Sequence, residues 1–337
     1  MFRPRFGCCS ILLVALLFAT GSPAFAQQPS MVWPKAPDTA RIRLERIIAS
    51  ARDIEGEPGF LAKVAQWLFG GSNRRHWLIQ PVGIAVSPDG VVYVADPGAR
   101  GVHRIDVRGE EYGFTSEGDG ASLVSPVGIA VAEDGAVYVS DSQRGTVTVY
   151  TATLSPRFEF NAGLTRPTGL AVVRGLLYVA DAGAHRIAVF GLDGIPRASF
   201  GGRGTEAGSY NFPVALAGDT SLFIVDALNH RVQRCDRAGV PLGSIGSIGT
   251  SGGSFASPKS VALDSEGHVY VTDALLDAMQ IFERDGALLL VVGTHGTGSG
   301  EFQAPSGVAI DAADRVYVVD SLNRRIQIFA YIKQAAR

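Results

Sequence analysis

The sequence predicts an all-β fold, a six-bladed β-propeller of four-stranded blades, because one pattern recurs six times. Each copy begins with Pro, continues with a short apolar run and a turn containing Gly or Asp, and ends with an aromatic residue three positions before an Asp. The copies begin 41 to 47 residues apart, at Pro81, Pro126, Pro167, Pro213, Pro258 and Pro305. A repeat of this length that is made of short strands is typical of a propeller.

Three strands are predicted in every repeat, and a fourth in most of them. In the first repeat they cover GIAV at 83–86, VVYVA at 91–95 and VHRID at 102–106; later outer strands include ALLLVV at 287–292. Val, Ile, Tyr and Phe dominate these runs, which are apolar on both faces. Blades that stack face to face bury both faces of each sheet, so this pattern favours a propeller over a sandwich.

The last repeat ends after its third strand, while residues 40–50 (ARIRLERIIAS) form a strand pattern outside any repeat. We therefore expect residues 40–50 to supply the outer strand of the last blade and to close the ring, which hides sheet edges. The propeller then spans residues 40–332. Helical spacing of apolar residues after Glu57-Pro58 predicts one short helix over residues 58–69, before blade one.

The N-terminus has the pattern of a signal peptide over residues 1–26. Arg3 and Arg5 precede an apolar stretch, and Ala24-Phe25-Ala26 matches a cleavage site. The stretch is too short to span a bilayer comfortably, so no transmembrane span is expected after its removal. We expect a periplasmic or extracellular protein, with residues 27–39 as a flexible lead-in. Cys235 is then the one remaining cysteine and is predicted to be a small core residue.

Composition argues against nucleic acid as a partner. Charged residues make up 18% of the chain, the net charge is −2, and there is no basic block. A nucleic-acid-binding protein would concentrate Lys and Arg on one surface.

The repeat resembles the NHL repeat, most fully as PTGLAV…LLYVADAGAHRIAVF (167–190) and PSGVAI…RVYVVDSLNRRIQIF (305–329). The resemblance covers residues 81–329 and implies a six-bladed propeller with sites usually at one mouth of the central channel. It is specific for the fold and leaves function open, because the family includes binding modules and several enzymes.

Six Asp residues close the second strands and could form a ring of carboxylates for a cation. They are Asp96, Asp141, Asp181, Asp226, Asp273 and Asp320. The favoured interpretation is structural: each caps the turn after its strand and pairs with a basic residue five positions on, where Arg186, Arg231 and Arg325 stand. Asp141 and Asp273 lack that Arg and are therefore the candidates for ligand binding.

Polar residues beside the repeated Pro are the other candidates for a ligand site. Lys259 follows Pro258 where the innermost strand should face the channel mouth, and Arg166 precedes Pro167. Thr168 and Ser306 occupy the position of Lys259 in their own blades. Lys259 and Arg166 could hold an anionic ligand; alternatively, Lys259 pairs with Asp273 or extends into solvent.

Metal and phosphate sites have weaker support in the sequence. His185 and His230 occupy equivalent positions and are weak candidates for zinc, since a solvated loop His is the simpler interpretation. The Gly-rich segments 201–209, 246–254 and 293–300 lack the helix that a phosphate loop requires behind it and are predicted to connect blades.

These observations predict an exported binding or scaffold module for a protein, peptide or glycan, with loops at one channel mouth as its site and no cofactor. The alternative is a metal-dependent lyase or hydrolase, similar to peptidyl-hydroxyglycine amidating lyases or lactonase-type propellers, with zinc or calcium at the channel mouth. The resemblance to the lyases implies a metal-binding Pro-His-Ser at the inner strands, where this chain has PVG, PTG, PVA, PKS and PSG.

Overall fold

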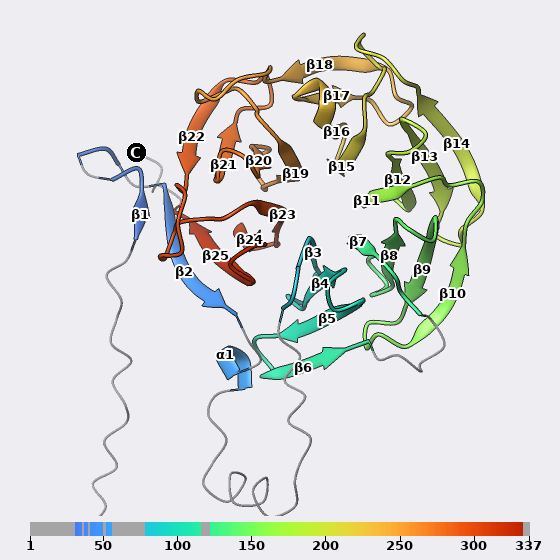
Figure 1. The fold of residues 1–337 in the computed structure, drawn as a ribbon, viewed down its shortest axis with the longest axis horizontal. Coiled ribbons are helices and arrows are strands. Elements are labelled where there is room, and N and C mark those ends of the chain that lie inside the picture. Colours follow the sequence, from blue (N-terminus) through green and yellow to red (C-terminus); the bar gives the residue numbers. More distant parts are fainter. Residues whose placement is uncertain are drawn as a thin grey trace, which may run out of the picture. The chain divides into compact units, whose positions relative to one another are not determined.

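In the computed structural model, the residues described are 31–35, 37–39, 41–49, 52–55, 78–115 and 122–332. They form six antiparallel sheets arranged as the blades of a ring, so the predicted six-bladed propeller is confirmed (Figure 1). Within each blade the strands run in chain order from the channel to the rim, except that the outer strand of the last blade comes from the N-terminal part of the chain.

The strand bounds repeat closely from blade to blade. Blade 1 contains β3 (Gly83–Val86), β4 (Val92–Asp96), β5 (Gly101–Asp106) and β6 (Glu111–Phe114). Blade 2 contains β7 (Pro126–Val131), β8 (Val137–Asp141), β9 (Thr146–Tyr150) and β10 (Pro156–Phe160). Blade 3 contains β11 (Pro167–Val173), β12 (Leu176–Asp181), β13 (Arg186–Gly191) and β14 (Pro196–Gly201). Blade 4 contains β15 (Pro213–Gly218), β16 (Leu222–Asp226), the 3-10 helix η1 (Ala227–Asn229), β17 (Arg231–Cys235) and β18 (Pro241–Ile245). Blade 5 contains β19 (Pro258–Leu263), β20 (Val269–Asp273), β21 (Ala278–Phe282) and β22 (Leu288–Val292). Blade 6 contains β23 (Pro305–Ile310), β24 (Arg315–Asp320), β25 (Arg325–Tyr331) and β2 (Ile42–Ile48), with β1 (Val32–Trp33) beyond it.

The hydrophobic core lies between blades. Each of the six clusters of buried apolar residues draws its members from two neighbouring sheets, and one of them joins blade 6 to blade 1. Both faces of the middle strands are therefore covered, which is the physical reason for their continuous apolar sequences. Cys235 is 1% exposed and belongs to the cluster between blades 3 and 4, as predicted.

The repeated aromatic residue of the second strand also joins neighbouring blades in the first half of the ring. The hydroxyl groups of Tyr93, Tyr138 and Tyr178 donate to main-chain carbonyls in the following blade, at 2.7, 2.8 and 3.3 Å. Blade 4 has Phe223 at this position, and there Arg284 of blade 5 stacks over the ring at 5.3 Å. Each of these four aromatic side chains therefore buries apolar area and also contacts the following blade, through the hydroxyl of Tyr or through the stacked guanidinium at Phe223.

The N-terminal strand closes the ring as predicted. β2 pairs antiparallel with β25, and Ile42 and Ile48 are 0% and 1% exposed within the cores on either side of blade 6. The sequence did not anticipate β1, which lies within the segment expected to be a flexible lead-in. It pairs with β2, and the edge of the Trp33 ring packs on Phe329 with centroids 5.7 Å apart.

Little helix is present in the described residues. α1 spans Arg52–Glu55, and the helix predicted over residues 58–69 lies outside the residues that the structure describes. None of the described helices is long and apolar enough to cross a membrane.

A chain that begins at Ile54 should lose much of its stability, because it lacks β1 and β2. Burying Ile42 and Ile48 alone contributes about 3–6 kcal/mol, at about 1.5–3 kcal/mol for each side chain. Removing β2 also exposes the edge of β25 to other chains. We expect a lower Tm or aggregation by differential scanning calorimetry, whereas a chain that begins at Met31 should melt with a chain that begins at Gln27. Equal melting of the Ile54 chain would rule out closure by β2.

Candidate functional site

One face of the ring gathers most of the candidate residues. The turns between second and third strands and the connections that precede each Pro lie on this side, which we call the Pro face. Main-chain hydrogen bonds tie the two kinds of segment together, as from Leu322 to Gln303 and from Ala274 to Ser257. The residues predicted from the sequence therefore lie on or near a single surface.

The six repeated Asp side chains hold the Pro face together. All six are 0% exposed, and each accepts at least one main-chain N–H from the connection that precedes the Pro of its own blade. Three also pair with the Arg five positions on, at 3.3, 2.9 and 2.7 Å, which confirms that part of the structural interpretation. At Asp96, burial raises the pKa, but hydrogen bonds from His103 and three main-chain amides outweigh it and leave the pKa below its usual value.

Asp141 and Asp273, two of the three carboxylates without an Arg five positions on, are satisfied by main-chain donors. Asp273 accepts from the amides of Ala256 and Ser257 before the Pro and of Leu275 and Leu276 after the strand, at 2.8–3.1 Å. Asp141 has the equivalent set of four amides at 2.6–3.2 Å. The structure therefore places both carboxylates inside the fold and away from the channel wall, and it does not pair Asp273 with Lys259.

The Gly-rich segments are folded connectors between blades. A Gln side chain from the third strand holds each of them in place. Gln233, Gln280 and Gln327 each accept a hydrogen bond from a main-chain amide of the loop and donate one to the carbonyl of the residue that follows that amide. A fully buried aromatic residue, Tyr210, Phe255 or Phe302, ends each loop. These interactions give the loops a structural role as connectors.

The central channel contains a cavity of about 250 Å³. Each inner strand contributes the first three residues after its Pro, so the cavity lies in the half of the channel next to the Pro face. The middle residue of the three is usually Gly because the inner strands approach closely; a Cβ on Gly128 would lie 1.9 Å from the carbonyl oxygen of Thr168. Blade 5 has Ser260 at this position.

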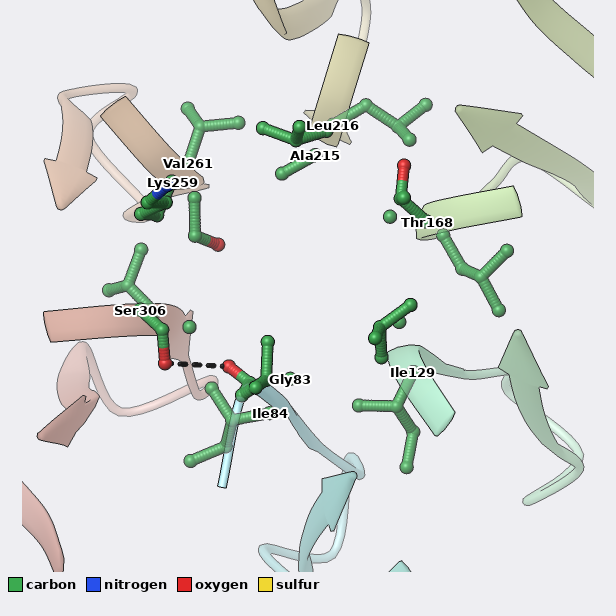
Figure 2. A pocket seen from close by; sticks show the side chains of 18 residues that line it. Gly83, Ile84, Ile129, Thr168, Ala215, Leu216, Lys259, Val261 and Ser306 are labelled. Carbon is green, nitrogen blue, oxygen red and sulfur yellow. Dashed lines mark hydrogen bonds between the residues drawn. The ribbon is translucent and has the colours of Figure 1, made fainter. Parts of the chain in front are cut away.

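Three of the predicted ligand-binding residues, Thr168, Lys259 and Ser306, line this cavity, and they differ in whether their polar groups already have hydrogen-bond partners. The Thr168 hydroxyl donates to the carbonyls of Ala180 and Pro213, and the Ser306 hydroxyl donates to that of Val82 at 3.0 Å. These two hydroxyls therefore link neighbouring inner strands. Lys259 is exposed and makes no side-chain hydrogen bond or ion pair within the described part of the chain. Figure 2 shows it at the edge of the opening, the one charged side chain among the 18 lining residues.

Arg166 lies on the Pro face beside the channel and is not part of the cavity wall. Its guanidinium stacks over the ring of Phe212, 5.2 Å from the centroid, at the start of the next blade. The carbonyl of Arg166 is tied to the turn after Asp181 through the amide of Ala182. Its charge therefore remains available at the mouth while its stem is packed.

Of the two histidines named as weak metal candidates, His185 has a local role, whereas the buried Nδ1 of His230 has no hydrogen-bond partner among the described residues. His185 has a positive φ of 54°, and its Nδ1 accepts from the main-chain amide of Phe212 at 3.1 Å. His230 has the same backbone conformation in the next blade. Across the described ranges, no three His, Cys, Asp or Glu side chains are grouped to hold a metal ion. Burial raises the pKa of the Cys235 thiol to about 11, so it stays protonated at neutral pH and is a poor nucleophile.

The Pro face also has an apolar feature that was not predicted from the sequence. Leu228, Leu275 and Leu322 stand two residues after the closing Asp of blades 4, 5 and 6, and they are 58%, 72% and 66% exposed. We call them the leucine crescent. Equivalent positions in consecutive blades of a ring lie at the same height, so the three leucines follow one another around the Pro face, one in each of three consecutive blades. The signal was readable as Asp-x-Leu in the last three repeats.

Unpaired cations accompany the leucine crescent. Within the described residues, exposed basic side chains without an acidic partner on the Pro face are Arg100, Arg166, Arg203, Lys259 and Arg324. Of the described acidic side chains on this face, Asp277 and Glu301 already accept hydrogen bonds, whereas Glu206 is exposed in the same loop as Arg203. The mouth therefore combines exposed apolar groups with positive charge.

Comparisons with known proteins agree with this architecture. The NHL repeat family matches residues 78–107 and 164–190, and a 6-bladed beta-propeller family matches residues 255–331. The chain is thus a six-bladed β-propeller that carries NHL repeats. A search of curated proteins found no match.

Solved structures with the same fold have diverse functions. A streptogramin B lyase is 12% identical, with a TM-score of 0.57 over 75% of this chain and 94% of its own. Hydrazine synthase of Kuenenia stuttgartiensis is 16% identical, with a TM-score of 0.56 over 79% and 98%. A chain of a nidogen/laminin complex is 21% identical, with a TM-score of 0.56 over 71% and 89%. Identities this low show the fold alone.

We predict that Asp141→Ala and Asp273→Ala each lower the free energy of unfolding by about 3 kcal/mol or more. Each removes the acceptor of four main-chain amides, and a hydrogen bond to a charged group contributes about 1.5–3 kcal/mol. Urea denaturation followed by circular dichroism measures the change. Glu133→Ala, at an exposed residue, is the matched control and should change stability by less than about 0.5 kcal/mol. Stabilities within that margin for the Asp variants would contradict the structural role.

Proposed function

We propose that this protein is a binding module that docks a partner protein on its Pro face. The observation that carries the proposal is the leucine crescent: three large apolar side chains at one repeated turn position, each more than half exposed. Local folding does not require a Leu there, because blades 1, 2 and 3 have Gly98, Gln143 and Gly183 at the same position. Exposed apolar groups that are gathered on one surface typically mark an interaction site.

The charges around the leucine crescent indicate the chemistry of the partner. Lys259 and Arg166 lie at the channel mouth, and Arg100 and Arg324 lie in turns on the same face. A surface with positive charge attracts and orients a negatively charged surface. We therefore infer a partner segment that presents apolar side chains together with acidic groups.

The rigid ring suits this function. Its Pro-face turns are fixed by buried carboxylates, so the crescent is already in place before a partner arrives. Binding then requires little ordering of the backbone, which reduces the entropic cost of association. The nidogen/laminin complex is support from fold alone, since it contains a propeller of this kind in a protein assembly. The signal-like pattern of residues 1–26 supports a partner outside the cytoplasm.

A metal-dependent lyase or hydrolase is the contrasting function, and metal content tests it. We expect the purified mature chain to hold far less than one equivalent of zinc or calcium, because the described carboxylates and imidazoles on the Pro face are engaged in the fold or isolated. Elemental analysis by plasma mass spectrometry after dialysis gives the measurement. One tightly held metal per chain, whose removal by a chelator also abolished an activity, would favour the enzyme.

The docking surface is tested by replacing the leucine crescent. We expect Leu228→Gln/Leu275→Gln/Leu322→Gln to lose the partner that the mature chain retains from the native envelope fraction after crosslinking. Lys259→Ala/Arg166→Ala should weaken capture of the same protein at low salt, and the difference from the unmodified chain should shrink at high salt, because exposed charges are screened.

Leu242→Gln/Leu289→Gln is the matched control for exposed apolar residues elsewhere. Both residues lie on outer strands at the rim and are 49% and 47% exposed, so the change in surface hydrophobicity is comparable. This variant should retain the partner. Loss of capture by the rim variant, with capture intact in the crescent variant, would place the interface on the rim.

A further inference from the structure

The channel cavity on the Pro face is lined by one charged side chain, that of Lys259, and by the hydroxyl of the next residue, Ser260. Of the lining hydroxyls, those of Thr168 and Ser306 already donate to carbonyls. The Ser260 hydroxyl is partly exposed and makes no hydrogen bond within the described residues. Lys259 and Ser260 are consecutive, and the irregular pairing of β19 with β20 between Pro258 and Ser260 brings both to the cavity wall.

Lys259 has no local counter-charge that could satisfy it. The nearest repeated carboxylate along the chain is Asp273, which is fully buried and accepts four main-chain amides. The other side chains of the cavity wall are Val, Ile, Leu, Ala, Thr and Ser, with Gly at four positions. Low-dielectric walls of this kind concentrate the field of a single charge in the opening.

We propose that the Pro-face end of the channel binds a carboxylate group of the docked partner, with the Lys259 ammonium as its ion pair and the Ser260 hydroxyl as a second donor. The inference rests on the proposed function, since it names the group that the partner inserts. One ammonium balances one negative charge, so a carboxylate fits better than a dianionic phosphate, which binds best to several cations or a bidentate Arg. A cavity of about 250 Å³ admits a chain end or one acidic side chain.

Methyl NMR titration of the mature chain tests the channel with small probes and does not require the partner. The probes are N-acetylleucine for a chain-end carboxylate, the α-amide of N-acetylglutamic acid for a side-chain carboxylate, and N-acetylleucinamide as the neutral analogue. The reporters are the methyl groups of Val261 and Val308, which line the cavity. We expect at least one carboxylate probe to bind about 10- to 100-fold more tightly than the neutral amide, as a charge-assisted hydrogen bond predicts. The better of the two carboxylates identifies its source in the partner.

Lys259→Val is the variant that isolates the ammonium. Val stands at the equivalent position in three blades, as Val82, Val127 and Val214, so the substitution suits the fold. It should weaken carboxylate binding by the same factor and leave the weak binding of the neutral amide unchanged. Lys259→Val/Val214→Lys moves the charge to the neighbouring blade and should recover binding, whereas the rim variant Leu242→Gln should match the unmodified chain.

The proposal is overturned if the neutral amide binds as tightly as both carboxylates, if Lys259→Val retains full carboxylate affinity, or if the relocated lysine recovers nothing in a folded protein. These outcomes are independent of partner capture. If carboxylate binding depends on Lys259 but partner capture does not depend on the leucine crescent, the channel site is supported and the docking surface is rejected. The reverse pattern would retain the docking surface alone.

Discussion

The hydrogen bonds between a buried Asp carboxylate and the main-chain amides before each Pro are the interaction on which the Pro face depends. The carboxylate closes the second strand of a blade and holds the chain that enters the first strand of that same blade. The connection from the previous blade therefore arrives in a defined position, and the Pro that follows it starts the inner strand. Since this occurs six times, the rim of the channel is rigid, and the side chains in the turns around it keep fixed positions.

This arrangement separates the residues that every blade needs from those that a few blades carry. Asp141 and Asp273 lack the Arg that follows the equivalent Asp by five positions in blades 3, 4 and 6. Main-chain amides donate to their carboxylates instead, so the folded structure satisfies both groups. Thr168 and Ser306 are likewise used to join inner strands. Lys259 and the leucine crescent have no such use. Lys259 stands where other blades have Val, Thr or Ser, and the crescent leucines stand where other blades have Gly or Gln. Those blades fold equally well, which is why we assign function to these exposed side chains.

The leucine crescent and Lys259 lie on the same half of the ring. The leucine crescent occupies blades 4, 5 and 6, and the channel lysine belongs to blade 5, between the two outer leucines. The turn that carries Leu275 is hydrogen-bonded to Ser257, two residues before Lys259, so apolar and charged contacts are adjacent. A partner that lies over this half of the mouth can place apolar side chains on the crescent and a negative group in the channel. Solved propellers of the same shape include a lyase and a chain of a nidogen/laminin complex, so shape alone does not choose between such functions.

The sequence by itself determined the number of blades, their strands and the closure by β2. The reason is that the Pro, the aromatic residue and the Asp recur at a regular spacing in every copy, so each repeat predicts the same local structure. It also predicted the buried role of Cys235 and the connector role of the Gly-rich segments. Only the tertiary structure decided which candidates face the channel. The irregular start of β19 places Lys259 beside the opening. The saturation of Asp273 depends on amides 16 and 17 residues earlier in the chain, and a local pattern does not reveal how many donors converge on one carboxylate. The leucine crescent needed the ring as well, because three leucines far apart in sequence become one surface only when consecutive blades bring them to the same height.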